Sequence, residues 1–448
     1  MRYFLAIAIG LLSACSLDLS RTPLDGGSGD ARSTDGLDAA IASDLDGIIP
    51  GDLPADAPVD VDRCASLTCT LGCDPVLQRC KRLDATNFDP AAFFDKVTGK
   101  LSPVAGITTI NTDTGEIKSG ATEIRPPNSK GVVKGIYWAL AAQGKGYPQL
   151  AVVGVRSLVV AAGATLSVEG SAALAIYSKT AVTVRGKVSV APKGISPGAG
   201  GYGGGARNGG AAAACHGGQG SGGGDVGACN AGGGGGGSGA KGGSGGATTC
   251  GSTAPGGVGG ASIRAGAPLL KPLFGGCGGG GGGEAVAQVG GNGGGGGGAL
   301  QISANGALTV IGTIDLPGEG GSGCGKYAAG GGGGGGGALL LEGTSVTVTG
   351  LLAANGGAGG GSGHSCTAGQ RGQATATRAL GGVGGYGAAG GVGGAGATPA
   401  GGNGQVSTLF GGGGGGAAGR IRINTPKRNV PAGNASPKPT FSSSVDTW

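Results

Sequence analysis

The chain is poor in the residues from which most globular enzymes are built. Of its 448 residues, 4% are aromatic and 12% are charged, and there are one Met and two His. The charged fraction is about half the 25% that is usual in soluble proteins. This composition argues against a conventional α/β enzyme. Collagen is also excluded, because the chain keeps no strict Gly-x-y register and its 21 prolines are an ordinary number.

Glycine is present in large excess, and it is unevenly placed. There are 115 glycines, of which 16 lie in residues 1–150 and 99 follow. A disordered linker does not fit, because 38% of the residues are hydrophobic and they occur in patterned blocks. Two differently built halves therefore share one chain.

The N-terminus has the pattern of a secretory signal. Arg2 precedes the apolar run Tyr3–Leu12, which is too short to span a bilayer as a mature helix. The run ends in Leu12-Ser13-Ala14-Cys15, which resembles the bacterial lipobox, in which the Cys is lipidated and becomes the first residue. We therefore expect residues 1–14 to be a signal peptide, Cys15 to carry acyl chains such as palmitate, and Ser16 to direct the protein to the outer membrane. An ordinary secretory signal that contains a Cys is the alternative.

Residues 15–62 predict a disordered acidic tether. After Cys15 this stretch has eleven Asp and only two Arg, Arg21 and Arg32, so its charge is −9, whereas residues 63–448 carry +14. Such a segment buries too little apolar surface to fold. The expected partner is a membrane, bound through the lipid anchor rather than through a spanning helix.

Ten cysteines remain once Cys15 is set aside, an even number in an exported chain. Four of them predict a small disulfide-rich module at residues 63–82, with a zinc site as the alternative: Cys64, Cys69, Cys73 and Cys80. The other six lie in glycine-rich stretches and are also disulfide candidates: Cys215, Cys229, Cys250, Cys277, Cys324 and Cys366. A metal site that uses the adjacent His216 and His364 is the less favoured interpretation, and we expect no metal.

A repeat lies between the glycine runs. Ala173–Val190 aligns without gaps with Ala299–Leu316, and Ala338–Ala354 joins them with one deletion. Ser157–Gly170 matches the first 14 positions, and Ala417–Asn424 looks like a terminal fragment. Apolar residues alternate in each unit, which indicates short strands with one buried face, separated by turn residues such as Asn305-Gly306. The expected fold class is all-β, a short β-solenoid similar to a right-handed parallel β-helix.

The glycine runs leave this repeat at one point. Extra residues always follow the third strand of a unit, and three runs end directly before the next unit: Gly293–Gly298, Gly330–Gly337 and Gly411–Gly416. These loops are either mobile or packed side by side as polyglycine-II helices, the glycine relative of polyproline II. The predicted domains are a β-rich cap at 83–150, the glycine-rich solenoid at 151–425 and a C-terminal tail at 426–448.

The repeat, the lipobox, the acidic tether and the cysteine cluster together resemble glycine-rich surface lipoproteins of myxobacteria. The segment Gly331–Gly357 carries the match most closely. The resemblance implies an envelope location and a β-solenoid, and it brings no established activity. The polyglycine portion is also similar in composition to the glycine-rich region of anaplastic-lymphoma-type receptor ectodomains.

No catalytic constellation emerges, so we expect neither an enzyme nor a cofactor. A polysaccharide lyase, the main enzymatic alternative, needs several carboxylates and a basic residue on one exposed face. The strand positions that should point outward offer only Asp315 and Glu342 among Gln301, Ser303 and several threonines.

Two surface features suggest binding instead. One repeat position reads Ser167, Thr183, Thr309 and Thr347, which predicts a stacked polar ladder on a solvated face or, alternatively, an ice- or glycan-binding surface. Scattered cations suggest contact with anionic polysaccharide or lipopolysaccharide rather than nucleic acid: Arg156, Arg185, Lys187, Lys193, Arg207 and Arg264. The expected role is structural, adhesive or matrix-binding, and the sequence leaves the oligomeric state open.

Overall fold

The computed structural model describes residues 63–69, 71–226, 229–250, 253–263, 268–284 and 289–448. These residues form strands and extended chain, with one short helix among them, α1 (Arg63–Ser66). The all-β expectation is confirmed. The signal peptide, Cys15, the acidic segment to residue 62 and Arg264 lie outside the described residues.

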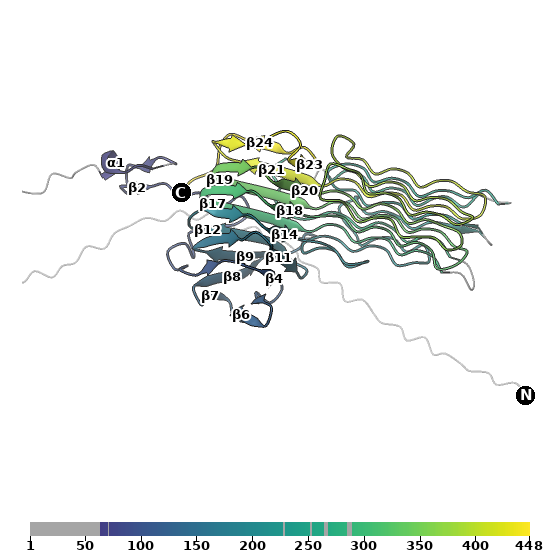
Figure 1. Ribbon diagram of the computed structural model, residues 1–448, viewed down its shortest axis with the longest axis horizontal. Coiled ribbons are helices and arrows are strands. Elements are labelled where there is room, and N and C mark those ends of the chain that lie inside the picture. Colours follow the sequence, from purple (N-terminus) through teal and green to yellow (C-terminus); the bar gives the residue numbers. More distant parts are fainter. Residues whose placement is uncertain (1–62, 70, 227–228, 251–252, 264–267, 285–288) are drawn as a thin grey trace, which may run out of the picture. The chain divides into compact units, whose positions relative to one another are not determined.

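Two large sheets hold most of the strands, and we call them together the strand body (Figure 1). The first sheet contains β3 (Lys100–Leu101), β7 (Gly131–Val133), β8 (Ile136–Ala141), β9 (Leu150–Val155), β10 (Ser157–Val160), β12 (Ala173–Ser178), β13 (Val182–Val184), β17 (Ala299–Val310), β19 (Ala338–Val348), β21 (Arg420–Asn424), β22 (Arg428–Asn429) and β24 (Thr440–Ser442). The second contains β4 (Gly106–Asn111), β5 (Ile117–Ser119), β6 (Thr122–Arg125), β11 (Ala164–Glu169), β14 (Lys187–Ser189), β18 (Thr313–Asp315), β20 (Leu351–Ala353) and β23 (Ala435–Ser436). Two antiparallel pairs lie outside these sheets: β1 (Cys73–Asp74) with β2 (Arg79–Cys80), and β15 (Asp225–Val226) with β16 (Cys229–Asn230).

Equivalent strands of successive units pair in parallel and in register. Leu174 lies opposite Leu300, which lies opposite Leu339. The same holds for the third strands, where Val188 pairs with Ile314 and Ile314 with Leu352. The alignment of the units that begin at residues 173, 299 and 338 is therefore confirmed as strand register.

The first and last units begin elsewhere than predicted. Ala173 pairs with Leu150 of β9, so Ser157 does not start a unit, and β10 lies beside the second strand of the next unit. At the other end Ala338 faces Arg420, so the last unit starts three residues after Ala417. Every residue of β9 is buried, and burial on both faces removes the alternation by which a strand is recognised.

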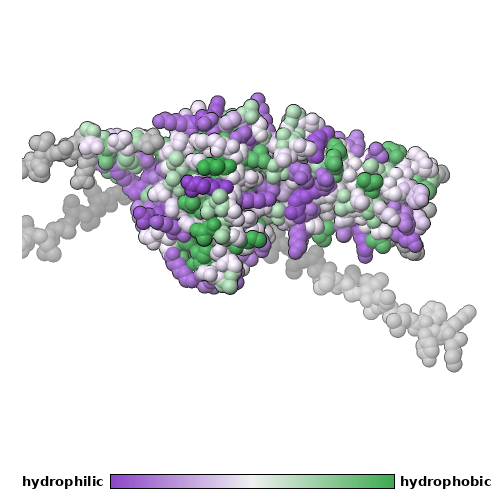
Figure 2. Space-filling view, viewed as in Figure 1, coloured by the Kyte–Doolittle hydropathy of each residue, from purple (hydrophilic) through white to green (hydrophobic). Residues whose placement is uncertain are grey.

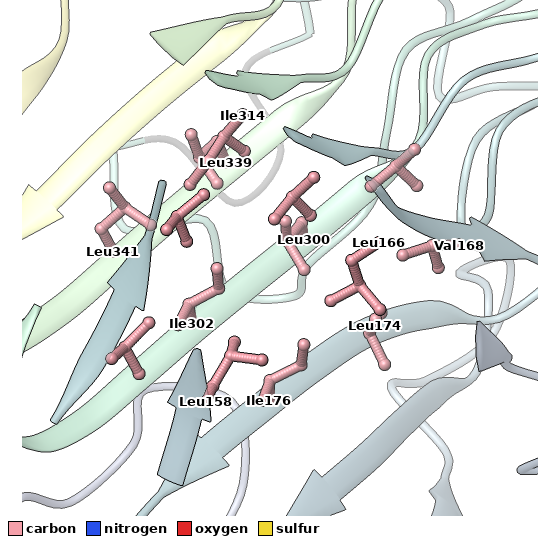
Figure 3. Close-up of a cluster of buried hydrophobic side chains, with 14 of the residues drawn as sticks. Leu158, Leu166, Val168, Leu174, Ile176, Leu300, Ile302, Ile314, Leu339 and Leu341 are labelled. Carbon is pink, nitrogen blue, oxygen red and sulfur yellow. The ribbon is translucent and has the colours of Figure 1, made fainter. Parts of the chain in front are cut away.

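The alternating apolar side chains of the two sheets meet in one core. Figure 3 shows Leu174 and Ile176 of β12, Leu300 and Ile302 of β17 and Leu166 of β11 pointing into the same space. These five side chains are fully buried. Burying a side chain of this size contributes about 1.5–3 kcal/mol, so stacked units stabilise one another through this core.

Glycine shapes the bend between the sheets. Gly186, Gly312 and Gly350 stack at the turn from the second strand to the third, where the amides of Thr313 and Leu351 donate to the carbonyls of Gly186 and Gly312, at 2.9 Å each. A Cβ on any of the three would come within 3.0 Å of a neighbouring carbonyl oxygen. The expected turn at Asn305-Gly306 is wrong, because β17 continues through it with a shift in register.

Antiparallel strands end both sheets on the N-terminal side. The first sheet ends with β9, β8 and β7, and the second ends with β4, β5 and β6. Arg125 is fully buried here, and its guanidinium donates to the carbonyls of Gly115 at 2.9 Å, Gly131 at 3.2 Å and Ser129. At the C-terminal side, residues 426–448 contribute the parallel strands β22, β23 and β24 rather than a separate tail.

The glycine-rich segments form a second part of the structure, which we call the glycine-rich body. It comprises the described residues of 190–298, 316–337 and 354–419, which leave the strands after β14, β18 and β20 and return at β17, β19 and β21. Figure 1 shows these segments as extended chains that lie side by side on one side of the sheets. The prediction that the loops leave the repeat at one point is confirmed.

Backbone hydrogen bonds in the glycine-rich body follow a period of three residues. In the last segment, Gly411, Gly414 and Ala417 donate to Asn230, Gly233 and Gly236; Gly412, Gly415 and Ala418 donate to Gln405, Gly402 and Pro399; Gly413, Gly416 and Gly419 donate to Gly360, Gly357 and Ala354. This segment is thus bonded in turn to three neighbours rather than to the two of a flat sheet. Extended backbone with three residues per turn presents its amides in three directions in this way. The buried peptide groups are therefore hydrogen-bonded to the backbone of neighbouring segments and need no side chains as partners.

Only glycine allows this packing. At Gly333, Gly334 and Gly416, a Cβ would lie within 3.0 Å of backbone atoms of a neighbouring segment. Ordinary carbon contacts need about 3.5–4.0 Å. The glycine content after residue 150 therefore follows from the approach of one backbone to another.

Candidate functional site

All ten candidate cysteines form disulfides. The pairs are Cys64–Cys73, Cys69–Cys80, Cys215–Cys277, Cys229–Cys250 and Cys324–Cys366. The first two cross-link the small module at 63–82, and the other three join segments of the glycine-rich body. The prediction of disulfides is confirmed, and the thiols are not available as zinc ligands.

The two histidines lie beside aromatic rings. His216 stacks on Tyr147 with ring centroids 4.2 Å apart, and its Nε2 lies 3.1 Å from the hydroxyl of Tyr202. His364 Nδ1 lies 2.8 Å from Ser365 Oγ. In the part of the chain that the structure describes, no three His, Cys, Asp or Glu side chains are grouped as metal ligands.

The predicted ladder is present without Ser167. Thr183 pairs with Thr309, Thr309 with Thr347, and the column ends at Asn429. Ser167 instead belongs to β11 in the second sheet, opposite Ser189, and Val159 takes its place in the ladder. The error follows from the misplaced first unit. A single column of three half-buried threonines is a stacked β-branched row, and the flanking positions of the described strands β13, β17 and β19 do not repeat it.

Three polar residues expected to point outward are buried. Gln301, Ser303 and Glu342 on the outer face of β17 and β19 are at most 2% exposed, because residues 83–94 and Leu270 cover that face. Glu342 Oε2 accepts hydrogen bonds from Gln301 Nε2 and Ser303 Oγ, each at 2.8 Å, and Oε1 accepts one from Asn424 Nδ2 at 3.1 Å. Thr86 also donates to Glu342. The carboxylate holds the covering segment in place and is not open to substrate.

Asp315 also lies away from any carboxylate cluster. It is 5% exposed and its Oδ2 lies 3.1 Å from Lys187 Nζ. Burial raises the pKa of this carboxyl, although Lys187 opposes the shift. Asp315 and Glu342 are on different sheets, so they provide neither the paired carboxylates nor the calcium ligands that lyase chemistry needs.

The predicted basic residues are dispersed. Arg156, Arg185, Lys193 and Arg207 are exposed at separate points of the chain, and Lys187 is held by Asp315. Lys193 lines a hollow of about 490 Å³ together with Glu169 and Arg371. This hollow has mixed charge, because Glu169 lies in the lining with the two cations. Arg371 also pairs with Glu319.

The surface of the glycine-rich body carries isolated apolar side chains. Figure 2 shows small green patches there, separated by pale and purple residues. Leu380, Val383 and Tyr386 are 57%, 67% and 95% exposed.

A basic groove lies beside the last unit, and sequence reasoning missed it. Two adjacent cavities of about 480 and 500 Å³ share Gly396, Ala397 and Lys438. The first is also lined by Arg420 and Arg422, which alternate along β21 and share the strand face opposite the core residues Ile421 and Ile423. We call the two cavities the β21 groove.

The three cations of the groove differ in their contacts and in their exposure. Arg422 is 8% exposed and its Nη1 donates to the carbonyl of Pro268 at 3.2 Å. The guanidinium carbon of Arg420 lies 4.8 Å from the ring centre of Phe274, and burial lowers the pKa of Arg420 to about 10. Arg420 therefore stays charged at neutral pH. Lys438 is exposed.

Comparison of the chain with protein-family models, with curated proteins and with solved structures finds no match. Within the described residues, no helix is both long and apolar enough to cross a membrane. The fold and the disulfides define the class of the protein: it is an all-β, disulfide-bonded protein with a glycine-rich body.

Proposed function

We propose that the chain is a lipid-anchored, non-catalytic protein of the bacterial outer membrane with a structural, adhesive or matrix-binding role. Its strand body is a short right-handed β-solenoid, and its glycine-rich body is a bundle of polyglycine-II helices. The sequence Leu12-Ser13-Ala14-Cys15 supports the anchor, and the resemblance to myxobacterial surface lipoproteins supports the envelope location.

One observation carries the structural role: the glycine-rich body is packed through its backbone. Its segments approach too closely for side chains, and three disulfides join them. An active site needs converging side chains. A cross-linked backbone bundle instead provides a stiff surface for contacts with other molecules.

The parallel register of β12, β17 and β19 supports the solenoid. The polyglycine-II assignment is supported by the three-residue period of the hydrogen bonds. A right-handed path is the usual one for connections between parallel strands.

The anchor is tested by expressing the full chain in a Gram-negative host with radiolabelled palmitate. We expect label in the wild-type chain, fractionation with the outer membrane and loss of both in Cys15→Ser. Protease added to intact cells tests surface exposure by digesting the wild-type chain. Unlabelled wild-type protein, or a Cys15→Ser chain that still fractionates with the outer membrane, would rule out the lipid anchor.

A further inference from the structure

We propose that the β21 groove is a binding site for an acidic saccharide whose carboxylates lie against Arg422 and Lys438. This inference goes beyond the structural role and does not depend on lipidation of Cys15. It names a site and a ligand class.

Charge is the first reason. The described residues that line the two cavities include Arg420, Arg422 and Lys438 and no Asp or Glu. Neither Arg422 nor Lys438 forms an ion pair with another described residue. Glu342 attracts Arg422 electrostatically without forming an ion pair with it, and its carboxylate accepts hydrogen bonds from Gln301, Ser303, Thr86 and Asn424. The groove therefore holds positive charge that an anion would neutralise.

Burial strengthens the attraction of Arg422 for an anion. Arg422 is almost fully covered, and burial lowers its pKa from the ordinary arginine value. A cation removed from water attracts an anion more strongly than a solvated one. A planar guanidinium also matches a carboxylate better than an ammonium does.

The remaining lining suits a sugar ring. The first cavity is lined by Pro268, Leu270, Pro399 and Pro437, and the second by Val430, Pro431, Pro439 and Phe441. The apolar surfaces of these residues match the C–H faces of a pyranose, and the cations are placed for its carboxylate. Each cavity lies within the range of about 300–1,000 Å³ that is usual for ligand sites. Since the two share Lys438, successive sugars of one chain could occupy both.

Other ligand classes fit less well. A divalent cation needs oxygen ligands, and the described lining of the groove offers no carboxylate. Single-stranded nucleic acid needs several exposed aromatic platforms, whereas Phe441 is the one aromatic residue among the described lining residues, and Arg428 already lies over its ring, 4.3 Å from the centre. An acidic peptide shares the carboxylate chemistry, so the experiment separates it from the saccharide.

The test is calorimetric titration of the full chain, carrying Cys15→Ser so that it purifies without lipid. The probes are trigalacturonate, its methyl ester, triglutamate and inorganic phosphate. The methyl ester keeps the rings and removes the charge. We expect binding of trigalacturonate that weakens with added salt, and little binding of the other three.

Lys438→Glu is the decisive variant, because the side chain of Lys438 is exposed. We expect Lys438→Glu and Arg422→Gln each to weaken trigalacturonate binding at least tenfold, and Lys130→Gln, which changes an exposed lysine of the N-terminal region, to leave it unchanged. If Arg422→Gln does not fold, Lys438→Glu decides alone.

The proposal is overturned by an absence of trigalacturonate binding or by binding that Lys438→Glu leaves intact. Equal binding of the methyl ester would remove the role of charge. Equal or tighter binding of triglutamate would assign the groove to acidic peptides, and equal binding of phosphate would reduce it to a nonspecific anion site.

Discussion

Substitution of a single buried glycine should destabilise the glycine-rich body, and Gly333 is the sharpest position. An alanine Cβ at Gly333 would lie within 3.0 Å of the carbonyl oxygens of Gly357 and Ala358. These are backbone atoms, so relief requires a shift of the whole neighbouring segment. Overpacking of this kind costs about 1–3 kcal/mol.

The shift also weakens hydrogen bonds. The amide of Gly333 donates to the carbonyl of Gly414 at 2.8 Å, and that of Gly357 donates to Gly334 at 2.9 Å. Each such bond contributes about 0.5–1.5 kcal/mol. Replacing glycine by alanine stiffens the unfolded chain, which offsets about 0.4–1 kcal/mol. With the two bonds weakened rather than broken, we take the net loss for Gly333→Ala as about 2–4 kcal/mol.

Gly203→Ala is the matched control. Gly203 lies in the same body, and a Cβ there would meet its nearest neighbour, the carbonyl oxygen of Ile195, at an ordinary 3.4 Å. We expect no loss of stability, and a gain of up to about 1 kcal/mol. The two variants make the same chemical change and differ in the space around it.

Hydrogen exchange measured by mass spectrometry is the appropriate assay, because it reports on the glycine-rich body separately from the strands. A loss of 2–4 kcal/mol should speed exchange in peptides covering residues 330–337 and 411–419 by about 30- to 1,000-fold, at about 1.4 kcal/mol for each factor of ten. Gly203→Ala should leave those rates unchanged. Equal exchange in both variants would refute the close-packed arrangement.

Three further changes test the rest of the structure. Arg125→Gln removes donors from the carbonyls of Gly115, Ser129 and Gly131, and it should cost about 3–5 kcal/mol in urea unfolding followed by the fluorescence of Trp138; a cost below about 1 kcal/mol would contradict the buried role of Arg125. Replacing both Cys324 and Cys366 by Ala opens a loop with a sequence separation of 42 and should lower the free energy of unfolding by about 4 kcal/mol. Limited proteolysis should then become faster, most of all in the two segments that the disulfide joins; an unchanged proteolysis rate would argue against the cross-link. Burial raises the pKa of Asp315 above its ordinary 3.8, so the folded chain holds this proton more tightly than the unfolded chain does. Stability should fall as pH rises from 3.8 through the raised pKa, and Asp315→Asn should remove that part of the dependence in urea titrations at several pH values; an unaltered profile would show that another group is responsible.

The sequence predicts the interior of the repeat well, because alternation survives wherever a strand has one polar face. Leu300 and Ile302 could be assigned to the core from the pattern alone. The pattern fails at Leu150–Val155, where both faces are buried, and at Asn305-Gly306, where a turn pair lies inside a continuous strand.

The groove has almost no local signal in the sequence. The alternation of Arg420 and Arg422 marks one face of a strand, but Pro268, Gly396 and Lys438 come from distant parts of the chain. Burial of Glu342 is equally invisible, because the residues that cover it are distant in the sequence: Thr86 donates to Glu342 across a separation of 256 residues. The lining of the groove and the burial of Glu342 both depend on packing between residues that are far apart in the sequence.

The three-residue period has a consequence for how long the glycine-rich body can be. In the proposed polyglycine-II arrangement, each segment rises about 3.1 Å per residue and returns to the same neighbour after one turn. Three glycines added on the outward pass of a hairpin and three on its return would move its tip outward by about 9 Å while every existing bond keeps its partner. The strands at the base, such as β17 and β19, would be untouched. The reach of this protein can therefore change in discrete steps by insertion at the loop tips alone, with no redesign of its core.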